Sequence, residues 1–309
     1  MDPRQAVTGR TLETLLAAPI TRLRLRASYA LCQQMARYRA GNFYYSFLIL
    51  PKLQRLAMCS LYAFMRVADD LADEEAIQVE KCRGLESWRC ELESSLQGQI
   101  RLPLFHALVD TVKRFEIPPE YLFTLLEGVT SDLSIDRFAT WEELRHYCYQ
   151  VASVVGLCCI RIWGTKDPRT IPLAESAGIA FQLTNILRDI RPDAEAGRVY
   201  LPDEVLQASG CSRETILQGQ WNESVRQAMA MVAHQAREEY RKAEPLQNYL
   251  PASGRAMWGI MMETYKGLLL KIENQGYLPG RELPRIGRWR KISLLFRAIP
   301  VRWGWKDTV

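Results

Sequence analysis

The sequence is poor in the residues from which most metal and redox sites are built. Its 309 residues include only three histidines, at positions 106, 146 and 234, and no HExxH motif. Zinc sites need several such ligands at close spacing, so the sequence argues against zinc, and any metal must be held by oxygen atoms. Eight cysteines occur without a CxxC pair and are predicted to be reduced core residues, at positions 32, 59, 82, 90, 148, 158, 159 and 211.

Long apolar runs and glycine-rich nucleotide motifs are also lacking. The most apolar segment, VASVVGLCCI, is closed by Arg161 and falls short of the roughly 18 residues that a membrane span needs. The first residues, MDPRQAVTGR, lack the apolar region of a signal peptide, which predicts a cytoplasmic protein. The absence of GxGxxG, P-loop and GxSxG motifs argues against nucleotide-binding folds and serine hydrolases.

Alternating strand patterns are missing as well, and helical spacing takes their place. Apolar residues recur three and four positions apart, as in Leu53, Leu56, Ala57 and Leu61. Prolines and glycines stand between such segments, and repeats of roughly 20–50 residues are not evident. With 48% hydrophobic and 24% charged residues, the chain is predicted to be one soluble all-α domain, residues 1–309, of about ten or more helices.

The segment LYAFMRVADDLADE places polar residues along one side of a predicted helix. Tyr62, Arg66, Asp69 and Asp73 follow one another at i, i+4, i+7 and i+11. Carboxylates at i and i+4 have Cβ atoms roughly 5–6 Å apart and can address one divalent ion or neighbouring ions. Magnesium prefers oxygen ligands and shares its shell with substrate phosphates. A solvated acidic helix would show the same spacing, but the apolar flanks predict that these acids lie deep.

A second polar face follows in AESAGIAFQLTNILRDI, 120 residues later. Gly178, Gln182, Asn185 and Asp189 share it, and small apolar side chains extend it. Small residues at helical spacing either border a cavity or mark close helix packing. Two acidic helices with such flanks predict a cavity with an anionic mouth.

Pro192 follows the second motif and separates Asp189 from Asp193. Proline cannot donate to the carbonyl four residues earlier and disfavours helical angles in the residue before it. The helix is therefore predicted to kink or end near Asp189, and Asp193 to point away from a regular i+4 position. On the turn AGRVYLP, Arg198 and Tyr200 can reach phosphate oxygens through charge and hydroxyl donation.

The net charge of +5 is concentrated near the C-terminus. Between 281 and 306, eight Lys or Arg face one Glu and alternate with Trp289, Phe296, Trp303 and Trp305. A basic segment with large aromatic residues suits an anionic membrane surface, which predicts that segment 281–309 touches the inner face of a membrane. A helix that caps the fold with a solvated basic face is the alternative. Nucleic acid is disfavoured because the positive charge does not extend over the body of the chain.

Together these segments resemble the squalene and phytoene synthase family, the head-to-head prenyl synthases. The similarity runs from NFYYSFLILP at 42–51 through YCYQVASVVG at 147–156 and QLTNILRDI at 182–190 to RVYLPDE at 198–204. It implies an all-α isoprenoid-synthase fold around a central apolar cavity, with the two acidic motifs facing each other at its mouth. It also implies clusters of Mg²⁺, with Mn²⁺ as an alternative, that grip the diphosphates of two allylic substrates.

The resemblance also implies roles for individual residues. The implied metal ligands are Asp69, Asp73, Asn185, Asp189 and Asp193. The implied catalytic residues are Tyr62, Arg66, Tyr147 and Arg188. The implied substrate-binding residues are Asn42, Phe43, Tyr44, Gln182, Arg198, Tyr200, Tyr265 and Arg285. The chain departs from the family pattern at Asn42, where serine is frequent, and at Arg191-Pro192.

The reaction implied is ionisation of one prenyl diphosphate, attack by a double bond of the second, and closure to a cyclopropylcarbinyl diphosphate. The main hypothesis is condensation of two farnesyl diphosphates to presqualene diphosphate in a hopanoid pathway. It rests on VASVVGLCCIRIWG and SFLILPKLQRLAMCSLYAF, which look closest to bacterial presqualene diphosphate synthases. Phytoene synthase, which joins two geranylgeranyl diphosphates in carotenoid synthesis, shares every catalytic residue named above.

Three further points stay open or count against other classes. Reduction onward to squalene by NADPH is open, because the reductive members of the family also lack a nucleotide fingerprint. A noncatalytic assembly protein of the same fold would have lost the acids, and head-to-tail synthases or terpene cyclases lack the TNILRD and RVYLP context. The chain is expected to be a monomer.

Overall fold

The computed structural model describes residues 9–39, 42–73, 76–135, 137–280, 283–285 and 287–309, with side chains except at 9–21, 42, 43, 288 and 291. Helices fill these ranges and no strand occurs in them, so the all-α prediction is confirmed. The first half holds α1 (Gly9–Arg39), α2 (Asn42–Ser46), η1 (Phe47–Ile49), α3 (Lys52–Asp73), α4 (Gln78–Leu96), α5 (Pro103–Phe115), α6 (Pro119–Asp132) and α7 (Trp141–Cys148). The second half holds η2 (Tyr149–Ser153), α8 (Val154–Trp163), α9 (Thr170–Glu195), α10 (Asp203–Ala208), α11 (Arg213–Leu217), α12 (Glu223–Ala243), η3 (Glu244–Tyr249), α13 (Ala252–Asn274) and α14 (Arg288–Arg302).

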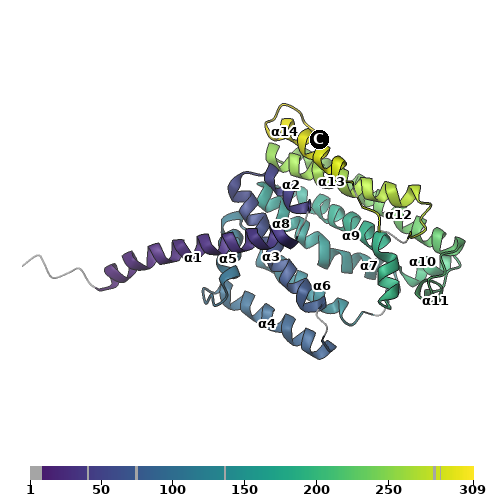
Figure 1. Ribbon diagram of the computed structural model, residues 1–309, viewed down its shortest axis with the longest axis horizontal. Coiled ribbons are helices and arrows are strands. Elements are labelled where there is room, and N and C mark those ends of the chain that lie inside the picture. Colours follow the sequence, from purple (N-terminus) through teal and green to yellow (C-terminus); the bar gives the residue numbers. More distant parts are fainter. Residues whose placement is uncertain (1–8, 40–41, 74–75, 136, 281–282, 286) are drawn as a thin grey trace, which may run out of the picture.

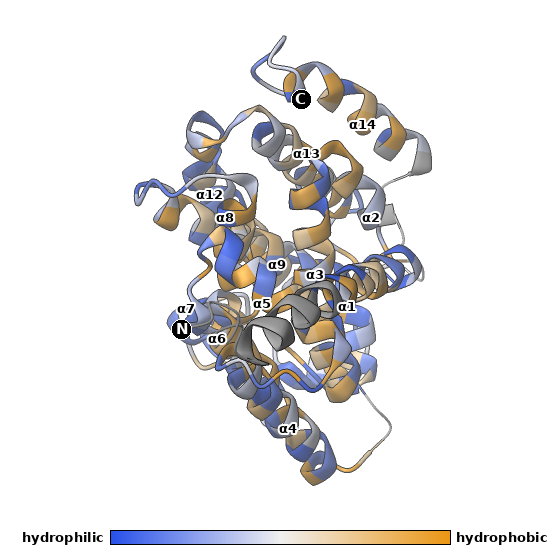
Figure 2. Ribbon diagram, turned by 90° about the vertical axis from the view of Figure 1, so that its left-hand side faces the viewer, coloured by the Kyte–Doolittle hydropathy of each residue, from blue (hydrophilic) through white to orange (hydrophobic). Residues whose placement is uncertain are grey.

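The helices pack around a central group that includes α3, α8 and α9 (Figure 1). Helix α12 packs along α9, and α14 packs on α13. Figure 2 shows α14 at one end of the molecule and α4 at the opposite end. Buried side chains from Cys32 to Val301 form one hydrophobic cluster, which ties these elements together.

Helix α3 shows how the apolar spacing produces this arrangement. Ala57, Leu61, Phe64 and Ala68 recur at i, i+4, i+7 and i+11, and all four are buried. The ring of Phe64 stacks on Trp88 of α4 with centroids 5.8 Å apart. Beside this stripe, Tyr62 and Arg66 are partly covered and Asp69 is exposed, while Ser60 is buried.

Two glycines allow neighbouring helices to approach η2, which is a π-helical turn. A Cβ atom added at Gly128 of α6 would lie 2.7 Å from Cβ of Gln150. One added at Gly178 of α9 would lie 2.4 Å from Cα of Ser153. The small residues of α9 therefore serve close helix packing. Some of them, Gly178 included, also line the central cavity, so both predicted uses of that face occur.

Replacing Gly178 with alanine is expected to lower the free energy of unfolding by about 1–3 kcal/mol, because the new methyl group meets backbone that cannot move aside. Gly84→Ala is the matched control. Its Cβ meets only the end of the Leu71 side chain at 3.2 Å, and the higher helix propensity of alanine offsets that contact by up to about 1 kcal/mol. Urea unfolding of both variants measures the difference. Equal stability of the two would contradict the close approach of α9 to η2.

The predicted end of the helix near Asp189 is wrong, because α9 continues through Pro192 to Glu195. Pro192 lies in the last turn, where the loss of one N–H donor removes a single helical hydrogen bond. Ile190 and Ala194, on either side of it, are buried against the rest of the fold and hold the helix in place. Asp193 therefore keeps a regular i+4 relation to Asp189.

The fold also tests the predictions that the cysteines are reduced core residues and that no segment spans a membrane. All eight cysteines lie in the described ranges and are free thiols, and six of them are buried. Cys90 is exposed on α4, so its prediction as a core residue is wrong, and Cys82 is only partly covered. Within the described residues, no helix combines the length and the hydropathy needed to cross a membrane.

Candidate active site

A cavity of about 360 Å³ lies between α3, α8, α9 and α13. Its polar wall comes from both sequence motifs: Tyr62 and Asp69 of α3, and Gln182 and Asn185 of α9. The rest of the wall is mostly apolar and includes Phe47, Met58, Leu61, Met65, Val155, Ile160, Trp163, Phe181, Trp258 and Met261. Two segments 120 residues apart in the chain thus meet at one pocket with a polar side and an apolar body.

The first motif divides its acids between the cavity and the surface of α3. Asp70 accepts hydrogen bonds from Arg39, at 2.7 Å, and from Arg66. Asp69 is solvent-accessible because it faces the cavity, while Asp73 is exposed at the end of the helix. The surrounding protein desolvates Asp69 and, against the opposing charge of Arg66, raises its pKa to about 6, with Asp73 adding to the rise.

The second motif presents an amide and two acids on consecutive turns of α9. Oδ1 of Asn185 is buried and, among the described residues, has no hydrogen-bond partner. Arg188 donates from Nε to Asp189 Oδ1 at 2.7 Å. Burial and, to a smaller extent, the neighbouring charge of Asp189 together raise the pKa of Asp193 to about 7. Both motifs therefore hold carboxylates that a nearby cation would favour in the charged form.

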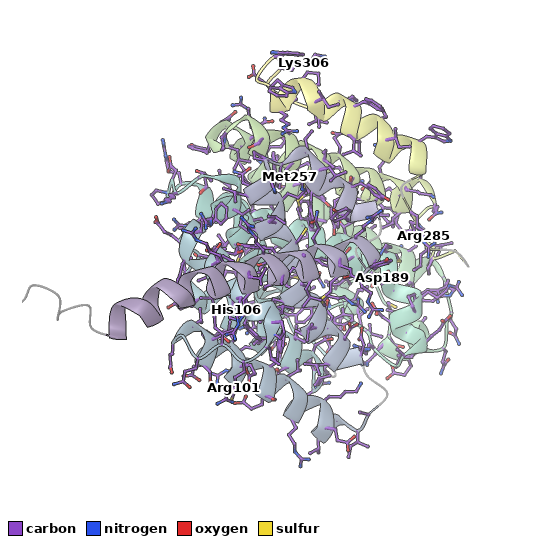
Figure 3. All side chains as sticks on the ribbon, turned by 60° about the vertical axis from the view of Figure 1, so that its left-hand side comes forward. Arg101, His106, Asp189, Met257, Arg285 and Lys306 are labelled. Carbon is purple, nitrogen blue, oxygen red and sulfur yellow. The ribbon has the colours of Figure 1, made fainter. Side chains whose placement is uncertain are left out.

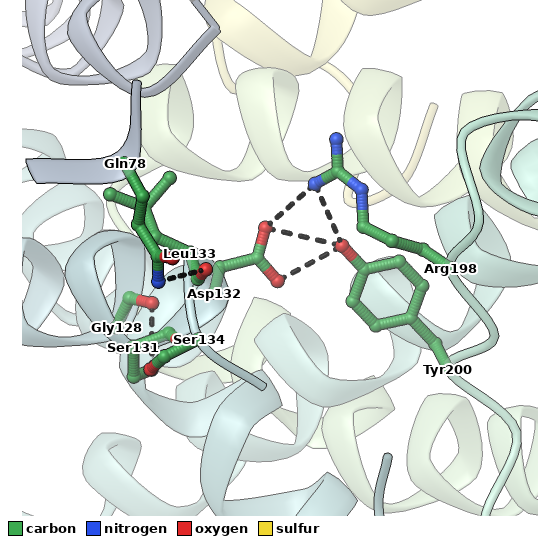
Figure 4. A network of polar contacts seen from close by, with 8 residues as sticks. All are labelled: Gln78, Gly128, Ser131, Asp132, Leu133, Ser134, Arg198 and Tyr200. Atoms are coloured by element: carbon green, nitrogen blue, oxygen red, sulfur yellow. Dashed lines mark hydrogen bonds and ion pairs between the residues drawn. The ribbon is translucent and has the colours of Figure 1, made fainter. Parts of the chain in front are cut away.

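A further acid, Asp132, lies at the site and was not predicted from the sequence. It lies at the end of α6 and accepts from Arg198 Nη1 at 3.2 Å and from the Tyr200 hydroxyl at 2.9 Å (Figure 4). The ring of Tyr147 stacks on that of Tyr200 with centroids 5.6 Å apart. Asp132 thus positions the basic and hydroxyl groups that were predicted to reach phosphate. Its place at the site depends on tertiary packing, because Arg198 and Tyr200 are 66 and 68 residues away in the sequence.

Two predicted aromatic residues occupy different positions relative to the cavity. Tyr265 lines it and stacks on Phe181 with centroids 4.4 Å apart. Tyr44 is buried, accepts a hydrogen bond from Gln33 at 3.0 Å, and does not line the described cavity wall. Tyr44 therefore acts in this structure as a core aromatic, and Tyr265 is placed to face a substrate.

The remaining predicted residues lie apart from the cavity or cannot be placed. Arg285 is exposed and lies at the outer edge of the molecule in Figure 3, away from the described cavity wall. The side chains of Asn42 and Phe43 fall outside the described residues. Of the predicted residues on α3 and α9, four therefore meet at the cavity wall: Tyr62, Asp69, Gln182 and Asn185. The described wall does not include Arg66, Asp73, Arg188, Asp189, Asp193 or Arg285.

The donor set fits a divalent cation that binds together with its substrate. In the described ranges, no group of three or more Asp, Glu, His or Cys side chains forms a ready-made metal site. Magnesium does not need one, because one or two carboxylates, waters and substrate phosphates complete its shell. The unpartnered Oδ1 of Asn185, one turn before Asp189, is an acceptor that such an ion would satisfy.

Comparison with known proteins identifies the family of this chain. The family model for squalene/phytoene synthase matches residues 36–290. The chain belongs to the squalene/phytoene synthase family. A phytoene synthase from Arthrospira platensis is 32% identical over 282 residues, which cover 87% of this chain and 91% of that protein. The resemblance seen in the sequence is therefore confirmed, and the chain is an enzyme of the head-to-head prenyl synthase class.

Two solved structures show the same fold. The squalene synthase HpnC from Alicyclobacillus acidocaldarius is 28% identical, with a TM-score of 0.79, over 84% of this chain and 97% of that one. A dehydrosqualene synthase crystallised with a ligand is 26% identical, with a TM-score of 0.81, over 89% of this chain and 96% of that one. The all-α isoprenoid-synthase architecture of this squalene/phytoene synthase family member therefore extends over most of its length.

Proposed function

We propose that the chain joins two geranylgeranyl diphosphates head to head and forms phytoene, through a cyclopropylcarbinyl diphosphate. The reaction class rests on one observation: the two acid-bearing helices, α3 and α9, line the same apolar cavity. The choice of substrate rests on relatives, since phytoene synthases from Arthrospira platensis and others are about 32% identical over most of the chain. This choice reverses the order suggested by the sequence, where farnesyl diphosphate was the main hypothesis.

Farnesyl diphosphate remains the second candidate, on the strength of the fold comparison. The squalene synthase and the dehydrosqualene synthase superpose on most of the chain with TM-scores of 0.79 and 0.81. Their sequence identities of 28% and 26% are lower than the 32% of the phytoene synthase. Geranylgeranyl diphosphate, the longer of the two substrates, is therefore the first candidate.

Magnesium would be held by Asp69 and Asp73 on one side and by Asn185, Asp189 and Asp193 on the other. When bound, it neutralises the charge that develops on the departing diphosphate. Helix geometry supports this assignment within each motif, because its acids lie one turn apart.

The side chains of the cavity supply the remaining requirements of the reaction. Breaking the C–O bond of the first diphosphate leaves an allylic cation, and the electron pair of a double bond in the second substrate forms the new C–C bond. Loss of a proton then closes the three-membered ring. Departure of the second diphosphate, rearrangement of the resulting cation and loss of a second proton give phytoene without a reductant. The stacked Phe181 and Tyr265 and the nearby Trp258 turn aromatic surface toward the cavity, which stabilises a cation without bonding to it. The apolar wall excludes water that would otherwise capture the cation.

The substrate test is incubation of the purified protein with Mg²⁺ and, in separate reactions, geranylgeranyl or farnesyl diphosphate, each with and without NADPH. Mass analysis is expected to show phytoene from the geranylgeranyl substrate, independent of NADPH, and a lower rate with farnesyl diphosphate. Chelation of the metal by EDTA is the control and should stop both reactions. Faster turnover of farnesyl diphosphate would favour the second candidate, and consumption of neither substrate would refute both.

A further inference from the structure

Helix α14 is apolar on two opposite faces. On one face, Leu294, Ala298 and Val301 are buried, and the helix packs against α13 on this side. The two helices run antiparallel, since a Cβ atom added at Gly267 of α13 would meet Arg290, and one added at Gly259 would meet the C-terminal Val309. This face completes the core in the ordinary way.

The opposite face carries large aromatic and aliphatic side chains that nothing in the described structure covers. Trp289, Phe296 and Trp303 are 84%, 68% and 63% exposed, and Ile292 and Ile299 between them are also exposed. These residues follow one another at i, i+3, i+7, i+10 and i+14, so they form one stripe along the helix. We call this set the outer stripe. A continuous exposed stripe of this kind marks an interaction surface, since single exposed apolar residues would be scattered.

The segment that carries the outer stripe is rich in positive charge. From residue 283 to 306 the sequence contains seven Lys or Arg and no acidic residue. The guanidinium of Arg302 lies over the ring of Trp303, 5.5 Å from its centroid, and Lys306 extends at the outer end of the segment in Figure 3. The helix α14 therefore offers an aromatic stripe within a basic segment.

We propose that the outer stripe docks on an anionic membrane surface, with α14 lying in the plane of the interface. Tryptophan prefers the boundary between headgroups and acyl chains, because its ring is apolar and its N–H is polar. Lys and Arg beside it bind anionic headgroups, and the two contributions add. A protein partner or a second copy would be matched by the apolar stripe alone. The excess of Lys and Arg in the segment over its flanking acids, Glu282 and Asp307, favours the lipid surface.

The turn η1 connects helix α14 with the cavity. The 3-10 turn η1 contacts α14, and Phe47 of η1 lines the cavity. Tyr45 and Leu48, which flank Phe47, are exposed. Docking through α14 would hold the cavity near the bilayer, where a water-insoluble product can leave and a prenyl substrate can enter. This consequence rests on the proposed function, whereas the docking itself does not.

The test is flotation of the full-length protein with vesicles of phosphatidylcholine alone and of phosphatidylcholine with phosphatidylglycerol, without substrate. The wild type is expected to bind the anionic vesicles and to be released by high salt. In the double variant Trp289→Ser/Phe296→Ser, binding to the anionic vesicles should weaken by at least about tenfold, because two aromatic side chains no longer enter the interface. The matched control is Leu23→Ser/Val79→Ser. It removes two apolar residues that are 70% and 60% exposed on α1 and α4, and it should bind like the wild type.

Three results would overturn the proposal: no binding of the wild type to anionic vesicles, equal binding to neutral vesicles, or equal loss in both double variants. A wild-type dimer that the Trp289→Ser/Phe296→Ser variant lacks, together with no vesicle binding, would assign the stripe to a second copy instead. Circular dichroism melting of all variants checks that they fold. Because the assay contains no substrate, its outcome is independent of whether phytoene is formed.

Discussion

Turnover is expected to fall on the order of 10³-fold or more when Asp69 is replaced by asparagine, while the fold keeps at least its normal stability. Asp69 faces the cavity from α3, and its carboxylate is a proposed magnesium ligand. Its pKa in the folded protein is about 6, above the ordinary 3.8. Because this pKa is raised, the contribution of Asp69 to the free energy of unfolding is fully present below about pH 4 and is lost as the pH rises through about 6. A neutral side chain avoids this loss, which amounts to about 1 kcal/mol after solvent screening at the open cavity is allowed for.

The measurement combines product formation with thermal unfolding at pH 8 for Asp69→Asn, Asp189→Asn and a control. Asp189→Asn should lose turnover to a similar extent, because it removes the corresponding acid of α9. Asp70→Asn is the control on the same helix: its carboxylate pairs with Arg39 and Arg66 and is not a proposed ligand. It should lose less than about tenfold, through freer motion of Arg66. Full turnover in both the Asp69 and Asp189 variants would show that the ligand assignment is wrong.

The two polar faces could be predicted from the sequence because they are local. The spacing of Tyr62, Arg66, Asp69 and Asp73 decides which side chains share a side of α3 as soon as the segment is helical. The same holds for Gln182 and its partners on α9. The contacts of Asp132 could not be predicted in this way. Its partners, Arg198 and Tyr200, are 66 and 68 residues away, and only the packing of α6 beside the turn after α9 joins them.

Other features depended on tertiary packing that overrides a local rule. Proline usually breaks a helix, yet α9 stays helical through Pro192 to Glu195, where Ile190 and Ala194 are buried. The cavity proposed to hold the prenyl chains is lined by residues from distant segments, such as Phe47 and Trp258. No single stretch of sequence contains that information. The reaction class was therefore accessible from the sequence, and the substrate length was not.

Metal affinity is expected to depend steeply on pH, because protons and magnesium compete for the same carboxylates. In the metal-free protein the pKa of Asp69 is about 6 and that of Asp193 is about 7. Both are raised, so both groups are largely charged at pH 8 and bind protons as the pH falls. At pH 6 about half of Asp69 and about nine-tenths of Asp193 carry a proton. Two independent sites of this kind weaken binding of a divalent ion about 20-fold between pH 8 and pH 6.

Binding of Mn²⁺ as a paramagnetic probe, without substrate, measures this dependence free of protonation of the diphosphate. The Asp193→Asn variant provides the sharpest comparison, because it removes the group with the higher pKa and leaves Asp69. At pH 8 this variant should bind Mn²⁺ more weakly than the wild type does. Between pH 8 and pH 6 its affinity should fall only about twofold, because only protonation of Asp69 then competes with the ion. The same slope in the variant and the wild type would mean that Asp193 does not compete for the ion. Since α9 runs unbroken through Pro192 and keeps Asp193 one turn beyond Asp189, the unequal slopes are the expected result.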